Sequence, residues 1–496
     1  MSLTNGDRAT LSSRPSRKWH LQHSYAQLPS LFHSAQLPTP VSAPRLVIFN
    51  RCLADSLGLD TDALAGESRA AIFSGNQLPP GAQPLAQAYA GHQYGNFTTL
   101  GDGRAILLGE QVAPDGLVFD IQLKGAGRTP YSRRGDGRAA LGPMLREYII
   151  SEAMHALGIP TTRSLAVVAT GEEVYRESPL PGAVLTRVAA SHVRVGTFEW
   201  AAARGGSDAV SALTDYTLLR HYPDRLAAEN PARALLEAVI ERQAELIARW
   251  MLVGFAHGVM NTDNMAVSGE TIDYGPCAFL DAFDPMRSFS SIDAHGRYAY
   301  GNQPGIAQWN LARFAETLLP LLHSEETKAI ALATELLGQF AQQFETHWVA
   351  GMRLKLGLFS SQPDDVALFK TLLEWMQTTR ADYTNTFADL PTVLAPGDMR
   401  REDAAFRAWH ERWLSRLSRQ PQAPAEAAQL RRAHAPAFIP RNHLVEGALA
   451  AAVQGDLAPL ERLLDVVTTP YAHLRDAPEY RQPAADAADY RTFCGT

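Results

Sequence analysis

Cysteine and long apolar runs are scarce in this 496-residue sequence. Three cysteines, Cys52, Cys277 and Cys494, are too few and too scattered for a disulfide scaffold or a zinc knuckle, so we expect a reducing compartment and a cytoplasmic location. No uninterrupted apolar stretch approaches the roughly 18 residues that span a bilayer, and we expect no membrane partner. The stretch around Arg14 and Arg17 lacks the apolar core of a secretory signal and is interpreted as an extended arm.

The chain also lacks an excess of basic residues. Its 45 basic and 52 acidic residues give a net charge of −7, so no overall positive field attracts a nucleic-acid backbone, and we expect no nucleic-acid partner. A share of 46% apolar and 20% charged residues excludes global disorder. Five of the 45 cations are lysines, which makes Lys124 conspicuous.

Length alone predicts two to four structural units, at about 150 residues each. The distribution of strand and helix patterns then predicts an α+β chain with a small, strand-rich N-lobe and a large, helical C-lobe. We expect an N-terminal extension at 1–75, the N-lobe at 76–190, the C-lobe at 191–420, and a linker, helix and tail at 421–496.

Short strands and one helix define the expected N-lobe. Apolar or alternating runs predict strands at 46–49, 105–108, 119–123 and 164–169. Apolar residues recur at helical spacing from 139 to 156, and a Gly-Ile-Pro sequence ends that helix. In the C-lobe, the clearest helix covers 232–255, helices dominate again at 308–378, and the Ala/Pro-rich stretch 420–440 is interpreted as a linker.

Glycines and cations cluster in the N-lobe. Gly101-Asp102-Gly103-Arg104 lies between two expected strands, where glycine lets a backbone approach phosphates. Lys124 ends the next strand, and the following helix carries Glu147, which suits an ammonium group held by a carboxylate and directed at phosphate oxygens. Asp136-Gly137 lies where the intervening loop enters the helix. A plain hairpin turn and a solvated run of cations are the structural alternatives.

A second constellation lies in the C-lobe and begins at His257. Its loop ends in Asn264, and two short expected strands, 265–267 and 271–272, form a hairpin that leads to Asp273. An amide and a carboxylate that converge in this way suit Mg²⁺ or Mn²⁺ bridging phosphates. Helix, loop, hairpin and Asp-aromatic-Gly follow in the order of a protein kinase, so we expect a protein-kinase-like bilobal fold.

The usual catalytic base of a kinase is missing from this loop. In the pattern His-x-Asp-x-x-x-x-Asn the base stands two residues after the histidine, and here that position is Val259. Asp263 is the only carboxylate in the loop that can accept a hydroxyl proton. The chain is therefore either a kinase relative without activity or an enzyme with a displaced base. Arg187 and Arg194, expected to follow the strand-rich part, would hold a polyphosphate together with Lys124.

Four motifs resemble the selenoprotein O family of protein adenylyltransferases, and the resemblance covers nearly the whole chain. The motifs are Ala90-Gly91-His92-Gln93-Tyr94-Gly95, residues 123–133, residues 257–265 and residues 272–276. The resemblance implies that ATP binds in the reverse sense to a kinase, with its γ-phosphate buried. It also implies transfer of AMP to Ser, Thr or Tyr hydroxyls of client proteins with release of pyrophosphate, self-modification, and UTP as a second candidate donor.

The resemblance further assigns roles to single residues. Asp263 would be the catalytic proton acceptor, and Glu147 would orient Lys124. Asn264 and Asp273 would hold Mg²⁺ or Mn²⁺. The residues that would contact ATP are Gly101, Gly103, Arg104, Lys124, Asp136, Gly137, Arg187, Arg194 and Asp273.

Cysteine marks a departure from the family. Eukaryotic members carry selenocysteine near the C-terminus, whereas this chain has Cys494. Some members pair that position with a cysteine beyond the Asp-Tyr-Gly motif, but the nearest one here is Cys277, directly after it. We expect a free thiol at Cys494.

Two alternatives to AMP transfer share these motifs. A kinase-like enzyme could use Asp263 as a shifted base and move the γ-phosphoryl group. A non-catalytic nucleotide-binding scaffold would explain Val259, but a scaffold has no need for a complete set of Lys124, Glu147, Asn264 and Asp273.

Overall fold

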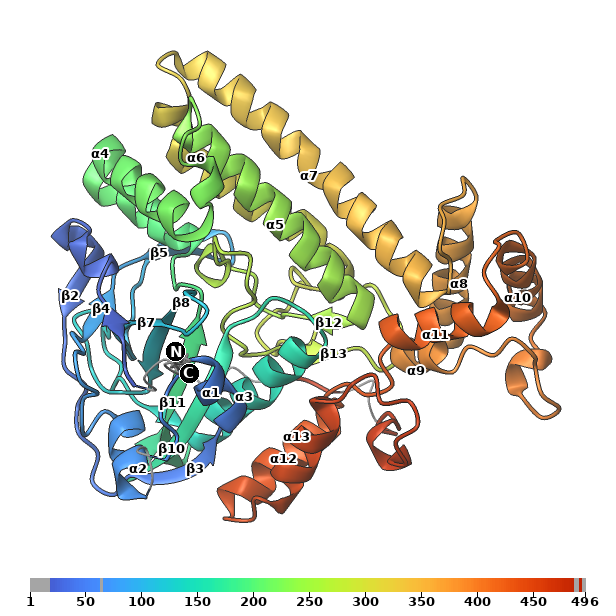
Figure 1. Cartoon of the computed structure of the whole chain (residues 1–496), viewed down its shortest axis with the longest axis horizontal. Coiled ribbons are helices and arrows are strands. Elements are labelled where there is room, and N and C mark those ends of the chain that lie inside the picture. Colours follow the sequence, from blue (N-terminus) through green and yellow to red (C-terminus); the bar gives the residue numbers. More distant parts are fainter. Residues whose placement is uncertain (1–17, 63–65, 486–489, 493–496) are drawn as a thin grey trace, which may run out of the picture.

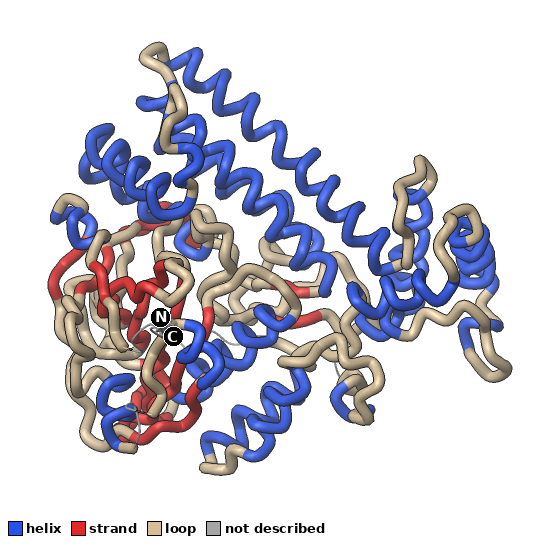
Figure 2. Tube along the Cα trace, viewed as in Figure 1, coloured by secondary structure: helices blue, strands red, loops and turns tan. Residues whose placement is uncertain are grey.

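The computed structural model describes residues 18–62, 66–485 and 490–492. A large antiparallel sheet lies at one end of the molecule, and long helices extend away from it (Figures 1 and 2). The chain is thus mixed α and β, with most strands before residue 190 and most helices after it. Arg14 and Arg17 of the expected arm, and Cys494 of the tail, lie outside the described residues. The expected lobe boundaries stay predictions.

The large sheet has the strand order β2-β4-β7-β8-β11-β10-β3, with β1 added to β7 and β9 added to β11. All of its paired strands are antiparallel. The strands are β1 Leu21–Gln22, β2 His33–Ala35, β3 Arg45–Phe49, β4 Leu85–Gln87, β7 Ala105–Val112, β8 Val118–Lys124, β9 Ala139–Ala140, β10 Arg163–Tyr175 and β11 Pro179–Ala189. The structure confirms the four expected strands and extends each of them.

The sequence analysis did not predict β11. The expectation that Arg187 follows the strand-rich part is wrong, because Arg187 lies within β11, opposite Gln122 of β8 and Ser164 of β10. Thr186 and Arg187 interrupt the apolar run of this strand and obscure its alternation. The interruption has a physical cause, because buried Arg187 pairs with carboxylates rather than with the apolar core.

Successive residues of the central strands face two different apolar cores. Val168 and Val184 face a core that contains residues of α1 and α2, whereas Val167 and Leu185 face the main core with α3. This alternation follows from the two-residue period of a strand. These helices are α1 Arg51–Ser56, α2 Glu67–Ser74 and α3 Leu141–Ala156. Helices therefore cover both faces of the sheet (Figure 1).

α3 confirms the helix expected at 139–156, except that its first two residues pair with β11 as β9. Gly158, with φ 77°, follows the end of the helix in the left-handed conformation. The apolar stripe of α3 is buried, and Glu147 is buried with it. A buried carboxylate requires charged or hydrogen-bonding partners, so the position of α3 depends on what Glu147 contacts.

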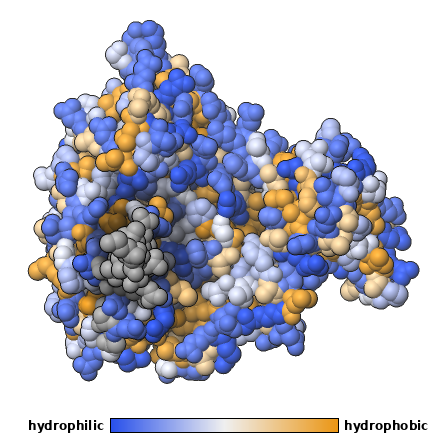
Figure 3. Space-filling model, viewed as in Figure 1, coloured by the Kyte–Doolittle hydropathy of each residue, from blue (hydrophilic) through white to orange (hydrophobic). Residues whose placement is uncertain are grey.

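The helical part is arranged around α5 (Pro231–Val253), which confirms the expected helix apart from its last two residues. Asn230 caps α5 by accepting a hydrogen bond from the backbone N–H of Arg233 at 2.9 Å, and left-handed Gly254 follows its last turn. The remaining helices of this part are α4 Val195–His221, α6 Gln303–Leu322, α7 Glu326–Lys355, α8 Asp365–Thr379, α9 Tyr383–Ala388 and α10 Ala404–Leu417. Among the described residues, no helix is both long and apolar enough to cross a membrane. The face seen in Figure 3 is mostly hydrophilic.

The expected hairpin at 265–267 and 271–272 is wrong. Gly269 does form a turn, and its N–H donates to the carbonyl of Ala266 at 3.1 Å. The flanking residues pair elsewhere, because Ala266 bridges to Arg194 and Thr271 bridges to Thr161. Backbone groups of the segments around residues 194 and 161 therefore pair with residues that a hairpin would have paired with each other.

The stretch 420–440 is not a linker. It contains α11 (Pro424–His434), and residues 435–440 are buried. Two helices follow instead of the single expected one, α12 (Asn442–Val453) and α13 (Ala458–Val467). Alanine is the best helix former and proline suits the first helical position, so a composition typical of linkers here specifies a helix.

The ion pairs of Arg441 attach the chain after α11 to the rest of the protein, and their contribution to stability can be tested. Arg441 Nη1 donates to Asp281 and to Asp382, at 2.6 Å each, and the residue is buried. We expect Arg441→Ala to lower the free energy of unfolding by about 3–5 kcal/mol in a urea titration, because two carboxylates lose a buried partner. Arg233→Ala, which removes an exposed pair with Glu237 on α5, is the matched control and should cause no measurable change. Equal effects would contradict the assignment.

Candidate active site

Lys124, Glu147, Arg187 and Asp273 form one ion network where the sheet meets the helices. Lys124 Nζ lies 2.6 Å from Glu147 Oε2 and 3.0 Å from Asp273 Oδ1. Arg187 Nε donates to Glu147 Oε1 at 2.7 Å, and its Nη2 donates to Asp273 Oδ1 at 2.5 Å. The network therefore joins β8, β11 and α3 to the loop that carries Asp273.

Arg194 extends this network to the catalytic loop expected from the sequence. It is the residue before α4, and its Nη1 donates to Asp273 Oδ2 at 2.7 Å and to the backbone carbonyl of Asp263 at 2.8 Å. Its guanidinium also lies over the ring of Tyr89, 4.6 Å from the centroid. One guanidinium nitrogen thus fixes the two aspartates relative to each other.

The electrostatics of the network favour an anionic ligand. Burial alone would raise the pKa of Asp273, but Arg187, Lys124 and Arg194 outweigh it and hold that pKa well below its usual value. The pKa of Glu147 is lowered for the same reason, because Arg187 and Lys124 outweigh its burial. Three cations against these two carboxylates leave a net positive charge, which phosphate oxygens would balance.

Asp263 has the opposite environment. It lies in a short 3₁₀ turn, Thr262–Asn264, and is 8% exposed. Burial raises its pKa to about 7, against the attraction of Arg194. Within the described chain, its Oδ1 is buried without a hydrogen-bond partner. A carboxylate that titrates near neutral pH and has an unused oxygen is suited to accept a proton from a ligand.

A cavity of about 890 Å³ lies beside the network and has Asp263 in its wall. Five of the residues expected to contact a nucleotide also line it, namely Gly101, Gly103, Arg104, Asp136 and Gly137. Lys124, Arg187, Arg194 and Asp273 instead form the adjoining network. The structure therefore brings the residues expected at the site together as two connected groups, a charged one and a cavity wall.

Two glycines of the cavity wall are required by close contacts. A Cβ on Gly101 would lie 2.5 Å from the ring of Tyr131, and a Cβ on Gly137 would lie 2.2 Å from the backbone carbon of Gly127. Gly137 also has φ 72°. Gly101 thus makes room for an aromatic side chain, a reason that differs from the phosphate approach expected from the sequence.

Asn264 and Asp273 supply the oxygen donors that a hard divalent cation prefers. Asn264 Nδ2 donates to the carbonyl of Val259 at 2.9 Å, which fixes which end of the amide is the oxygen. The described residues contain no group of three or more His, Cys, Asp or Glu side chains arranged for a metal. Both oxygens of Asp273 already accept from Lys124, Arg187 or Arg194, so Mg²⁺ or Mn²⁺ of the kind that takes its other ligands from water and phosphate would replace one of these contacts.

Sequence reasoning missed three residues that shape the cavity. Tyr89 stacks on Arg194, Tyr131 packs against Gly101, and Arg176 Nη1 donates to Asp136 Oδ2 at 2.9 Å. Tyr89 precedes one family-like motif and Tyr131 lies within another, so these two motifs could have indicated that both residues belong to the site. Nothing in the sequence around Arg176 distinguishes it from the other arginines of the chain.

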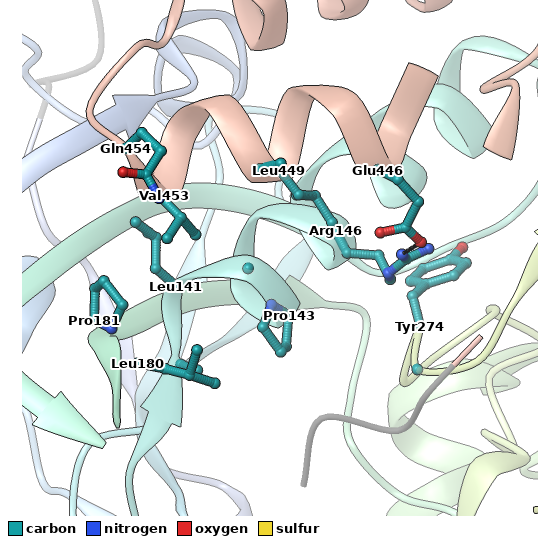
Figure 4. A pocket seen from close by; sticks show the side chains of 14 residues that line it. Leu141, Pro143, Arg146, Leu180, Pro181, Tyr274, Glu446, Leu449, Val453 and Gln454 are labelled. Carbon is teal, nitrogen blue, oxygen red and sulfur yellow. Dashed lines mark hydrogen bonds and ion pairs between the residues drawn. The ribbon is translucent and has the colours of Figure 1, made fainter. Parts of the chain in front are cut away.

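A second cavity, of about 470 Å³, lies between α3 and α12 (Figure 4). Its wall is mostly apolar, and Arg146 and Glu446 point toward each other at one end beside Tyr274. This cation is already paired, and none of the residues expected at the site lines this cavity. α12 thus faces the helix that carries Glu147 across this cavity, with Val453 beside Leu141.

The variant Asp263→Asn tests how much the ionised, buried carboxylate of Asp263 lowers the free energy of unfolding. The pKa of Asp263 is higher in the folded state than its ordinary value of 3.8, so wild-type stability should fall as pH rises from about 4 to about 7 and then level off. The variant lacks this loss and should be more stable at pH 8, by up to about 4 kcal/mol, with no difference near pH 4. Urea titrations at both pH values check this. A stability difference that does not change with pH would contradict it.

Comparison with known proteins gives a consistent result. The family model described as protein adenylyltransferase SelO matches residues 17–468. The chain is 58% identical over 492 residues to a protein nucleotidyltransferase YdiU of Syntrophotalea carbinolica, covering 99% of this chain and 100% of that one. It is 60% identical to the proteins of the same name from Halalkalibacterium halodurans, over 97% of this chain and 99% of that one, and Geobacillus kaustophilus, over 96% and 99%. The chain therefore belongs to the SelO family of protein adenylyltransferases.

Proposed function

We propose that this enzyme transfers AMP from ATP to Ser, Thr or Tyr hydroxyls of client proteins in the cytoplasm, and releases pyrophosphate. The observation that carries the proposal is Asp263, a buried carboxylate with an unused oxygen at the wall of the cavity, whose backbone carbonyl accepts a hydrogen bond from Arg194. The position of a kinase base is Val259, which can accept no proton. A base displaced to Asp263 supports a reacting phosphorus that lies in a different place than in a kinase.

A kinase-like bilobal arrangement is part of this proposal. It is supported by Lys124 at the end of a sheet strand paired with Glu147 on the helix behind it. It is also supported by the chain order of His257, Asn264 and Asp273 after a long helix. In kinases the corresponding lysine, glutamate, asparagine and aspartate hold the phosphates and metal ions.

The proposed nucleotide enters with its phosphates toward the ion network. Lys124, Arg187 and Arg194 would hold the β- and γ-phosphates, because they carry the surplus positive charge. The cavity lined by Gly101, Gly103, Arg104, Asp136 and Gly137 would take the nucleoside. The α-phosphate then lies between the two groups, next to Asp263, which is the reverse of the order in a kinase.

Asp263 would act on the acceptor hydroxyl. The hydroxyl oxygen forms a bond to the α-phosphorus, the bond from that phosphorus to the pyrophosphate oxygen breaks, and the carboxylate of Asp263 takes the proton. Lys124, Arg187 and Arg194 stabilise the negative charge on the departing pyrophosphate. Asn264 and Asp273 would hold Mg²⁺ or Mn²⁺, which when bound neutralises charge on the phosphates.

The position of the transferred label tests the reaction. The full chain is incubated with Mg²⁺ or Mn²⁺ and with ATP labelled at either the α- or the γ-phosphate, using casein as a general acceptor and self-modification as a second readout. We expect the α-label and the mass of AMP on the product. A γ-label with the mass of one phosphate would instead establish a kinase-like enzyme. Tight ATP binding without any product would favour a scaffold.

The two aspartates should have separable effects. Asp263→Asn should lower the transfer rate at saturating ATP at least 100-fold and leave ATP affinity nearly unchanged, because the base is lost and the phosphate contacts remain. Asp273→Asn should abolish transfer and change ATP affinity, because its three cations lose their partner. Asp208→Asn, at an exposed position of α4, is the control. Full activity of either active-site variant would refute the assignment.

The pH dependence of transfer is a further test. Asp263 accepts a proton only when ionised, and its pKa is about 7. The kcat/KM for ATP, which reports the groups of the free enzyme, should therefore rise about tenfold per pH unit below pH 7 and level off above it. Rates measured between pH 5.5 and 8.5 check this, and a profile that is flat from pH 5.5 would exclude Asp263 as the base.

A further inference from the structure

The two-stranded ribbon of β5 (Ala90–Gln93) and β6 (Asn96–Thr99) lies apart from the large sheet and contacts the loop that carries Asp263. The backbone N–H of His92 donates to Thr262 Oγ1 at 2.6 Å. The backbone N–H of Tyr94 donates to Asn261 Oδ1 at 3.0 Å. Backbone groups of one short ribbon thus hold two successive loop residues directly before Asp263.

Gly91 of the same ribbon packs against Asp263 itself. A Cβ on Gly91 would lie 2.3 Å from Asp263 Oδ1, too close for any side chain. A Cβ on Gly196 would lie 2.0 Å from the carbonyl oxygen of Ala90, so α4 also packs directly on the ribbon. The ribbon therefore contributes to the burial of Asp263, and it does so through backbone contact.

A buried carboxylate connects the ribbon, the loop and α4. Glu199 of α4 accepts a hydrogen bond from Thr262 Oγ1 at 2.7 Å with Oε2, and its Oε1 lies 2.5 Å from His92 Nδ1. Thr262 is fully buried and Glu199 is 4% exposed. The Thr262 hydroxyl is therefore a junction, because it accepts from the ribbon backbone and donates to α4 at the same time.

The turn of the ribbon is held in a strained conformation. Tyr94 has φ 51°, which is uncommon for a residue with a side chain. Its ring packs on Tyr298 at 5.1 Å between centroids, and the Tyr298 hydroxyl donates to the same Asn261 oxygen at 2.6 Å. Such strain persists only where the surroundings impose it, and here they fix the ribbon against the loop.

We propose that the β5–β6 ribbon and Glu199 form the positioning element of Asp263, with Thr262 as the residue through which they act. This proposal rests on the proposed function of Asp263 as the base. Lys124, Arg187 and Arg194 hold the phosphates, whereas the ribbon sets where the base lies relative to the acceptor. Loss of the Thr262 junction should therefore slow the chemical step and leave nucleotide binding intact.

Thr262→Val and Thr262→Ser are the matched variants. Valine keeps the shape of threonine but removes the hydroxyl, and serine keeps the hydroxyl. We expect Thr262→Val to lower the rate at saturating ATP about 10- to 100-fold, the effect of a misplacement near 1 Å, with a Kd for Mg²⁺–ATP within twofold of wild type. Thr262→Ser should stay within about threefold of wild type. Casein is the acceptor, and calorimetric titration gives the Kd.

A second variant, His92→Ala, tests the same proposal if Thr262→Val does not fold. His92 lies nearer the surface, so His92→Ala removes one partner of Glu199 without opening the core. We expect it to lower the same rate about three- to tenfold with unchanged ATP affinity. Wild-type rates in both Thr262→Val and His92→Ala, or equal losses in Thr262→Val and Thr262→Ser, would overturn the proposal.

Hydrogen exchange tests the positioning role independently of the group that the enzyme transfers. Exchange of the backbone amides in residues 257–265 and 90–99 should become faster in Thr262→Val, with no change in α7, whatever the enzyme transfers. The rate is followed with the label that wild type transfers, so a γ-phosphoryl product refutes AMP transfer and still allows the comparison. Unchanged exchange in both segments would overturn the positioning role.

Discussion

The shared carboxylate of Asp273 is the contact on which the rest of the site depends. Lys124 from β8, Arg187 from β11 and Arg194 at the start of α4 all contact it, so one side chain joins two strands and a helix to its own loop. Asp273 also has φ 61°, a conformation that these partners stabilise. A buried charge without partners costs several kcal/mol. The sheet and the helices are therefore held at a fixed distance by charge as well as by apolar packing.

The surroundings shift the pKa values of the two aspartates of the site in opposite directions. Asp273 is surrounded by cations and stays ionised, whereas Asp263 is buried with only its backbone on Arg194 and has a pKa of about 7. Pairs of carboxylates whose environments push their pKa values apart commonly divide the work of an active site. Here one would hold phosphate-binding groups and metal in place, and the other would move a proton. This contrast supports our proposal that Asp263 is the base, since position 259 is valine.

Elements distant in the sequence support the two aspartates. The β5–β6 ribbon donates to the loop before Asp263, and Glu199 of α4 accepts from the same loop, both at the hydroxyl of Thr262. α12, some 300 residues after α3, packs on the helix that carries Glu147 and pairs Glu446 with Arg146 (Figure 4). Each support buries polar groups that other segments satisfy, so none of them would persist as an isolated element.

The sequence by itself determined the mixed α and β class, four strands of the large sheet, the helices α3 and α5 and the residue types of the site, because periodicity and motif spacing are local properties. It did not place Arg187 in a strand, pair Ala266 with Arg194, or show a helix at 424–434. Those outcomes depend on which backbone and charged partners are available in three dimensions. Only the tertiary structure showed that Asp263 is buried beside Gly91, because desolvation is set by neighbours far along the chain.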